Sequence, residues 1–320
     1  MLQGSPSTWA VTVRRRLPML SAILAAAAGL TGCGALGPTG QSHGVQVVAA
    51  ESTWGSVAAA LAGRAATVTS IIANPAIDPH SYEPEAADAR AFAQANVAIL
   101  NGLGYDNWAR RLLAADAPAA RVTINVGHIL GLHDGDNPHR WYSPSDVQRI
   151  ADTITAALMA AEPPQAAYLR ARRAWFSTTD LARYNGLIAD IRSRDRGAPV
   201  GASESVFAPM AAALGLRLIT PGGLLRAVSD GGDVSAGDMA AAQSQIAAHA
   251  IRVWVLNTQN TTPNVNILTA QARAAGIPVV SMTETPDPAT ASFADWQTRQ
   301  LAALAGALGL GTAAGVTHAN

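Results

Sequence analysis

Short apolar stretches typical of strands alternate along this chain with longer stretches that have the periodicity of helices. In the first part of the chain the strand-like stretches are residues 45–50, 67–73, 97–102 and 121–127. A helical pattern follows the first of these stretches and ends at Ala62, and further helical patterns cover residues 85–96 and 107–115. Regular alternation of this kind predicts the α/β class, with parallel sheets covered by helices.

The alternation stops near the middle of the chain, where two helical patterns follow each other. The first covers residues 145–161, and Pro163-Pro164 separates it from a second run over residues 165–194. Thirty residues of helix would be roughly 45 Å long. Because that is long for a helix inside one domain, this segment is predicted to be a rod between two domains.

Strand-like stretches return after the rod, at residues 198–203, 216–220, 251–257 and 278–284, and a helical pattern over residues 293–308 ends the series. We therefore predict two α/β lobes joined by one long rigid helix. The predicted limits are 45–162 for the first lobe, 163–195 for the linking helix, 196–310 for the second lobe and 311–320 for a tail.

The N-terminal residues have the order of a secretion signal. Arg14–Arg16 precede an apolar run over residues 17–30, which ends in Thr31-Gly32-Cys33. The run is shorter than the roughly 20 residues of a spanning helix but has the length of a signal-peptide core. Small residues before the cysteine resemble the cleavage box of bacterial lipoproteins, in which this cysteine carries the lipid.

We therefore expect a signal peptide at residues 1–32, lipidation of Cys33, and a flexible tether over residues 33–44, which are rich in Gly, Pro, Ser and Thr. A buried Cys33 behind an ordinary signal peptide is the alternative. As the single cysteine of the chain, Cys33 cannot form an internal disulfide or a CxxC redox pair.

Composition and charge favour a globular protein that does not bind nucleic acid. Hydrophobic residues make up 49% of the chain and charged residues 14%, which allows a sizeable core. Without Arg14–Arg16 the charged residues are 19 Arg against 22 acids, a net charge of about −3. The chain has no basic patch interleaved with aromatic residues, so nucleic acid is not an expected partner.

Two of the seven histidines, His80 and His139, lie in similar surroundings. Each directly follows a proline, and a second proline comes a few residues later, at Pro84 and Pro144. Proline fixes φ and restricts the residue before it, so both imidazoles are expected on stiff loops, as metal ligands require. Either histidine alone would more often be an ordinary loop residue, but the repeated pattern favours a ligand role.

Two glutamates occupy corresponding places in the second predicted lobe. Glu204 directly follows one strand-like stretch, and Glu284 ends another. Because ligands in open α/β sheets collect at the carboxyl ends of the strands, both side chains are candidate ligands. His128 and His133 fall in a loop and are candidate accessory ligands.

Five segments in one order carry a family resemblance: DPHSYEP, NGLGYDNW, NPHRWYSP, ESVFAP and IPVVSMTET. From Val45 to Leu308 the chain resembles the metal-specific substrate-binding lipoproteins of ABC importers for zinc and manganese. The resemblance implies two α/β lobes joined by a rigid helix, with the metal ion between them. It also implies a monomer on the extracytoplasmic face of the bacterial membrane, with an ABC permease as its partner.

The resemblance implies four metal ligands. They are the histidine of the first segment, His80; the histidine of the third, His139; Glu204 of the fourth; and Glu284 of the last. Asp287, three residues after Glu284, competes for the fourth place. Zinc-specific members often have a long loop rich in His and Asp before the second ligand, and here residues 127–138 are short, which leaves zinc specificity open.

Two imidazoles and two carboxylates suit Zn²⁺, Mn²⁺ or Fe²⁺ and disfavour Cu⁺. Carboxylates that bind through both oxygens slightly favour Mn²⁺ or Fe²⁺. Zn²⁺, however, binds most such sites more tightly than Mn²⁺ does. The ligand set alone therefore leaves the identity of the metal open. All ligands must be deprotonated, so affinity is expected to fall below about pH 6, where imidazoles become protonated. The rigid helix favours small adjustments on binding over a wide closure of the lobes.

Two other kinds of protein could have some of these sequence features. A surface adhesin or a metal-buffering lipoprotein would have the same fold and site. A metallohydrolase is disfavoured, because four protein ligands leave no open position for water, and the sequence has neither an HExxH motif nor a nucleophile elbow. The expected function is capture of a divalent metal ion for import, without enzymatic activity.

Overall fold

The structure is a computed structural model, which describes residues 44–77 and 82–309. The predicted signal peptide, Cys33, His80 and the predicted tail at residues 311–320 lie outside the described residues. None of the helices in the described ranges is long and apolar enough to cross a membrane.

The first sheet is parallel and has the strand order β2-β1-β3-β4. Its strands are β1 (Val45–Glu51), β2 (Ala66–Ile72), β3 (Val97–Leu100) and β4 (Val122–Asn125). The central strand β3 is buried along its whole length, as expected when helices cover both faces of a parallel sheet. The helices of this first lobe are α1 (Ser52–Ala62), α2 (Ala86–Gln94), α3 (Asn107–Ala115), α4 (Val126–Leu130) and α5 (Pro144–Ala161).

The second sheet repeats this arrangement, with the order β6-β5-β7-β8 and parallel pairing throughout. Its strands are β5 (Pro199–Ala202), β6 (Arg217–Leu218), β7 (Trp254–Asn257) and β8 (Val279–Met282). The helices of this second lobe are α8 (Ala208–Leu214), α9 (Gly222–Ser229), α10 (Ala236–Ala247), α11 (Pro263–Ala274) and α12 (Phe293–Ala307). The prediction of two α/β lobes with parallel sheets flanked by helices is confirmed.

In each sheet the first strand has its next two strands on opposite sides. In the first sheet β2 and β3 flank β1, and in the second sheet β6 and β7 flank β5, so the strand order reverses between β1 and β3 and between β5 and β7. Ligands bind at the carboxyl ends of the strands beside such a reversal, because the connecting loops there run to opposite sides of the sheet. The predicted ligands Glu204 and Glu284 both follow strands of the second sheet, β5 and β8.

The helical connection between the lobes is interrupted by a π-helical turn. It consists of α6 (Ala166–Trp175), the π turn η4 (Phe176–Asp180) and α7 (Ala182–Arg194). The backbone N–H of Leu181 donates to the carbonyl of Phe176 at 3.0 Å, and both side chains are fully buried. On an α-helix the side chains of residues i and i+5 point to different sides. An i→i+5 hydrogen bond brings them to the same side, so the π turn lets the side chains of Phe176 and Leu181 both enter the core.

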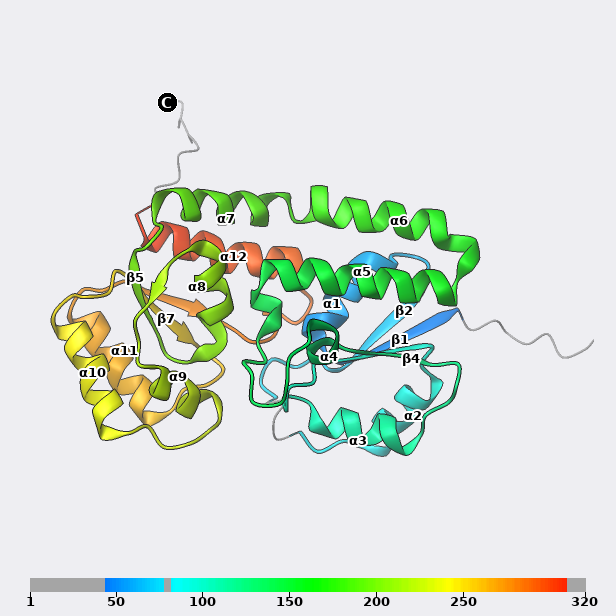
Figure 1. Cartoon of the computed structure of the whole chain (residues 1–320), viewed down its shortest axis with the longest axis horizontal. Helices are drawn as coiled ribbons and strands as arrows, with labels where there is room; N and C mark the ends of the chain where they lie inside the picture. The colour runs from blue at the N-terminus through cyan, green and yellow to red at the C-terminus, as the bar shows by residue number, and fades with distance from the viewer. Residues whose placement is uncertain (1–43, 78–81, 310–320) are drawn as a thin grey trace, which may run out of the picture. The chain divides into compact units, whose positions relative to one another are not determined.

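The two lobes share one core in the described part of the chain. A single cluster of buried apolar side chains includes Val47 of β1, Leu169 of α6, Ile191 of α7 and Val200 of β5. Figure 1 shows α6 and α7 running along both lobes, with α5 packed on α6 and α12 packed on α7. The connection is therefore packed against both lobes along its length, unlike a free rod.

Candidate metal centre

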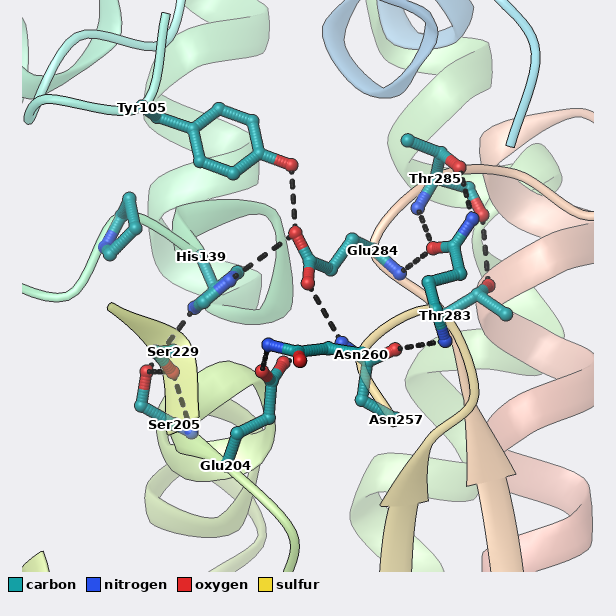
Figure 2. A network of polar contacts seen from close by, with 12 residues as sticks. Tyr105, His139, Glu204, Ser205, Ser229, Asn257, Asn260, Thr283, Glu284 and Thr285 are labelled. Atoms are coloured by element: carbon teal, nitrogen blue, oxygen red, sulfur yellow. Dashed lines mark hydrogen bonds and ion pairs between the residues drawn. The ribbon is translucent and has the colours of Figure 1, made fainter. Parts of the chain in front are cut away.

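Three of the four predicted ligands meet between the lobes. Each of His139, Glu204 and Glu284 offers one ligand atom, and these atoms all lie within 4.8 Å of one another. Nε2 of His139 is 3.7 Å from Oε2 of Glu284. Figure 2 shows the three side chains pointing toward a common centre. The first lobe contributes the histidine, and the second contributes both glutamates.

The other candidates of the sequence do not belong to this cluster among the described residues. His128, in α4, and His133, in the loop after it, are both exposed. The side chain of Asp287 is exposed as well.

His139 is held by Asn137 with its Nε2 toward the centre. Oδ1 of Asn137 accepts the backbone N–H of His139 at 3.0 Å and lies 2.9 Å from its Nδ1. An acceptor beside Nδ1 places the ring proton there and leaves Nε2 with its lone pair, the form that binds a metal ion. Nδ2 of Asn137 donates to the carbonyl of Ser205 at 2.8 Å, which links this loop to the second lobe.

Glu204 begins the turn after β5, and its side chain is fully buried. Nδ2 of Asn257 donates to its Oε1 at 2.5 Å, and Nδ2 of Asn260 donates to its Oε2 at 2.7 Å. Burial, the larger cause, and the negative charge of Glu284 together raise the pKa of Glu204 to about 7, although His139 and the two amides act in the opposite direction.

Glu284 lies two residues after β8 and connects the two lobes. Its side chain is 12% exposed. Oε1 accepts from Nδ2 of Asn257 at 2.7 Å, and Oε2 accepts from the hydroxyl of Tyr105 in the first lobe at 2.9 Å. Its backbone carbonyl accepts from the hydroxyl of Thr53 at 3.1 Å, and its N–H donates to Oε1 of Gln259. The carboxylate is therefore fixed from both sides of the interface.

A pair of buried carboxyl groups supports the first-lobe side of the site. Asp106 accepts the backbone N–H groups of Asn101 and Gly102 at 2.5 and 2.8 Å, and burial raises its pKa to about 6. Burial, together with the charge of Asp106, also raises the pKa of Glu51 at the end of β1. Nδ2 of Asn101 in turn donates to the carbonyl of Pro138, next to His139, at 3.0 Å.

The sequence interpretation missed the side chains that hold the two glutamates. Asn257, Gln259 and Asn260 follow one another closely at the carboxyl end of β7, the strand between β5 and β8. Polar residues at the carboxyl ends of strands in open α/β sheets are candidates for a binding site, which is how Glu204 and Glu284 were predicted. The same rule applies to this polar segment, so its position after a strand could have indicated its place at the site.

A cleft of about 950 Å³ opens beside the site and has walls from both lobes. The first lobe contributes Pro75, Ala76 and Ile77, the residues just before the segment with His80. The second lobe contributes Arg226 and Asp230, among others, and Glu284 lies at the wall shared with the site. Among the described residues, the cleft therefore reaches the site at Glu284.

Two α/β lobes with a buried cluster of imidazole and carboxylate groups between them define a two-lobed protein with a candidate cation site. The family model described as ZnuA, zinc-uptake complex component A, periplasmic, matches residues 47–307. The chain belongs to this family, and the predicted resemblance is confirmed.

Curated relatives are similar to parts of the chain. The manganese-binding lipoprotein MntA of Halalkalibacterium halodurans is 31% identical over 150 residues, which cover 45% of this chain and 48% of the relative. The iron-binding protein YfeA of Yersinia pestis is 30% identical over 117 residues, which cover 34% of this chain and 37% of the relative. The chain thus aligns with half or less of the length of these relatives.

Solved structures share the fold over most of the chain. A manganese-bound mutant of the periplasmic metal-binding protein of Candidatus Liberibacter asiaticus has a TM-score of 0.70 at 20% identity, covering 82% of this chain and 99% of that one. The periplasmic zinc-binding protein TroA of Treponema pallidum has a TM-score of 0.67 at 16% identity, covering 83% and 99%. At these identities the likeness concerns the fold.

Proposed function

We propose that this protein captures one divalent transition-metal ion between its lobes and delivers it to an ABC importer. The observation that carries the proposal is the convergence of His139, Glu204 and Glu284 from the two lobes within 4.8 Å. Two carboxylates around a dication, with neutral imidazoles, make a neutral site, which offsets the cost of burying the charges. Membership of a family of periplasmic zinc-uptake components supports the same role.

His80 is the proposed fourth ligand. The chain reaches it directly from Ile77, which lines the cleft beside the site. Nε2 of Gln259 donates to the carbonyl of Pro75, and Oε1 of the same side chain accepts the backbone N–H of Glu284. One side chain therefore ties Pro75, five residues before His80 in the sequence, to the Glu284 loop, which supports His80 as a further ligand.

Zn²⁺ or Mn²⁺ is the proposed cargo, and Fe²⁺ fits the same donors. Imidazole and carboxylate together suit all three ions. The names of the similar proteins include manganese, iron and zinc binding, and neighbouring structures hold manganese or cadmium. The metal ion is handled as a transported substrate, and we propose no catalytic step for it.

The proposal extends to the organisation of the whole chain. Residues 1–32 would be removed as a signal peptide, and Cys33 would carry a lipid that holds a monomer at the extracytoplasmic face of the membrane. Residues 45–162 and 196–310 would be the two lobes and residues 163–195 their connection. The shared core of the lobes supports small adjustments on metal binding over a wide closure.

Native mass spectrometry of the purified protein mixed with equimolar Zn²⁺, Mn²⁺ and Fe²⁺ tests the binding step. We expect one ion per chain for the unmodified protein and none for His139→Ala, because this change removes a buried ligand. His128→Ala is the matched control and should retain one ion, since His128 is exposed on α4. Equal metal retention by His139→Ala, or no retention by the unmodified protein, would contradict the proposal.

Growth of the source bacterium at low metal concentration tests the delivery step. Deletion of the gene should slow growth, excess metal should restore it, and so should the unmodified gene but not the His139→Ala variant. A protein that only buffers metal, or acts as an adhesin, would leave uptake of radioactive metal unchanged on deletion. That result would refute delivery while leaving metal binding intact.

A further inference from the structure

One side-chain nitrogen connects the two glutamates of the centre. Nδ2 of Asn257 donates to Oε1 of Glu204 at 2.5 Å and to Oε1 of Glu284 at 2.7 Å (Figure 2). Asn257 is fully buried. It is the last residue of β7, which pairs with β5 on one side and β8 on the other, so the two glutamates emerge on either side of it.

The orientation of this amide follows from its other hydrogen bonds. Oδ1 of Asn257 accepts the backbone N–H of Gln259 at 3.0 Å, and the backbone N–H of Asn257 donates to the hydroxyl of Ser203 at 2.9 Å. Rotating the amide by half a turn would set its NH₂ group against the N–H of Gln259 and its oxygen against two carboxylates. The amide can therefore satisfy its neighbours only with Nδ2 toward the glutamates.

The other side-chain donors described above each serve one glutamate. Asn260 donates to Glu204, and the hydroxyl of Tyr105 donates to Glu284. Among the hydrogen bonds of the described residues, those of Asn257 are the ones that join the two carboxylates. A neutral group with two hydrogens at this point reduces the repulsion between two nearby negative charges, because it gives each of them a hydrogen bond.

We propose that Asn257 is the positioning residue that sets the spacing and orientation of Glu204 and Glu284, and through them the affinity and coordination geometry of the metal ion. This inference rests on the proposed role of the two glutamates as ligands. Groups that orient metal ligands typically change metal affinity by about 10- to 100-fold when they are removed. Without the bridge each carboxylate can rotate and offer both oxygens, which favours Mn²⁺ relative to Zn²⁺.

Asn257→Ala removes the bridge, and Asn257→Ser leaves a hydroxyl whose single hydrogen cannot serve both glutamates. The matched control is Asn266→Ala, at an exposed asparagine of α11 in the same lobe. The measurements are competition titrations with Zn²⁺ and Mn²⁺, the visible absorption spectrum with Co²⁺, and thermal unfolding of the metal-free protein. Co²⁺ is informative because its absorption weakens as its coordination number rises above four.

We expect both Asn257 variants to bind Zn²⁺ about 10- to 100-fold more weakly, with a smaller loss for Mn²⁺ and a weaker Co²⁺ spectrum, while the control matches the unmodified protein. Should the alanine variant not fold, the serine variant decides. Unchanged affinities would overturn the inference. Equal losses for both metals with an unchanged Co²⁺ spectrum would also overturn it, because they would show a structural role alone. If the unmodified protein binds none of these ions, the proposed function itself fails.

Discussion

Replacing Glu284 with alanine should abolish tight metal binding, whereas replacing Asp287 should not. The Glu284 carboxylate lies 3.7 Å from Nε2 of His139 and is held by Tyr105 and Asn257, so it is already oriented toward the centre. Loss of a ligand should cost more than the roughly 100-fold upper range seen for groups that only orient ligands. Isothermal titration with Zn²⁺ and with Mn²⁺ measures both variants.

Asp287→Ala is a suitable control for that experiment. The Asp287 side chain is exposed, and the described contact of this residue with Arg299 uses its backbone carbonyl, which alanine retains. Metal binding that survives in Glu284→Ala but fails in Asp287→Ala would show that Asp287, and not Glu284, is the second carboxylate ligand. Retention in both single variants but not in the double variant would mean that the two carboxylates can replace each other.

The fold could be predicted from the sequence because its signals are local. The helix expected over residues 107–115 is α3 (Asn107–Ala115) itself, and the predicted strands lie at the same places as the observed ones. Most predicted strands were too long, since apolar residues continue into the loops. The stretch expected over residues 121–127 ends at Asn125, whose side chain accepts the backbone N–H of His128 and so begins α4.

The connection between the lobes could be predicted in its extent but not in its detail. Its helical pattern is clear from the sequence, but the π turn at Phe176 depends on which side chains the core can accept. That requirement comes from residues of both lobes that are distant in sequence. The same holds for the shared core, because a pattern along one strand or helix does not reveal the element that packs against it.

The sequence predicts the three side chains that meet between the lobes, but not the side chains that hold them in place. The positions of Glu204 and Glu284 after strands, and of His139 between two prolines, can be seen in the sequence. Asn257 has the same kind of position, but an asparagine after a strand has many ordinary roles. Its place between two glutamates follows from the strand order β6-β5-β7-β8, which puts β7 between β5 and β8. The sequence alone does not determine that order.

Acid should weaken metal binding from a higher pH than imidazole protonation alone would imply. The pKa of Glu204 in the metal-free protein is about 7, so a proton already competes with the metal near neutral pH. We expect affinity to decrease from about pH 7 downward, rather than from about pH 6. This loss of affinity can be measured as a loss of folding stability. When the free metal concentration is about 1,000 times Kd, metal binding raises the free energy of unfolding by about 4 kcal/mol. Each tenfold loss of affinity then lowers this stabilisation by about 1.4 kcal/mol.

As the pH falls, the metal-free fold should gain stability from its carboxyl groups with raised pKa values, whereas metal binding becomes weaker. A carboxyl group with a raised pKa binds more protons in the folded than in the unfolded state, so its contribution is fully present below the unfolded value and is lost as the pH rises. For Glu204 this window extends from about 4.5 to about 7, and Asp106, with a pKa of about 6, acts in the same direction. The difference in melting temperature with and without metal should therefore shrink from pH 7.5 to pH 5.5, because the proton that stabilises the metal-free fold at Glu204 is the same proton that competes with the metal.

Thermal unfolding at about pH 7.5, 6.5 and 5.5, with and without saturating Zn²⁺, measures both the metal-free stability and the stabilisation by metal. Glu204→Gln is the matched variant, because it keeps the size of the side chain and one of its two acceptor oxygens but cannot titrate. Its metal-free stability should depend less on pH than that of the unmodified protein, and the difference isolates Glu204 from the other titrating groups. A stabilisation by metal that stays constant or grows toward pH 5.5 would show that no ligand takes up a proton in this range, which would contradict the expected competition between a proton and the metal at Glu204.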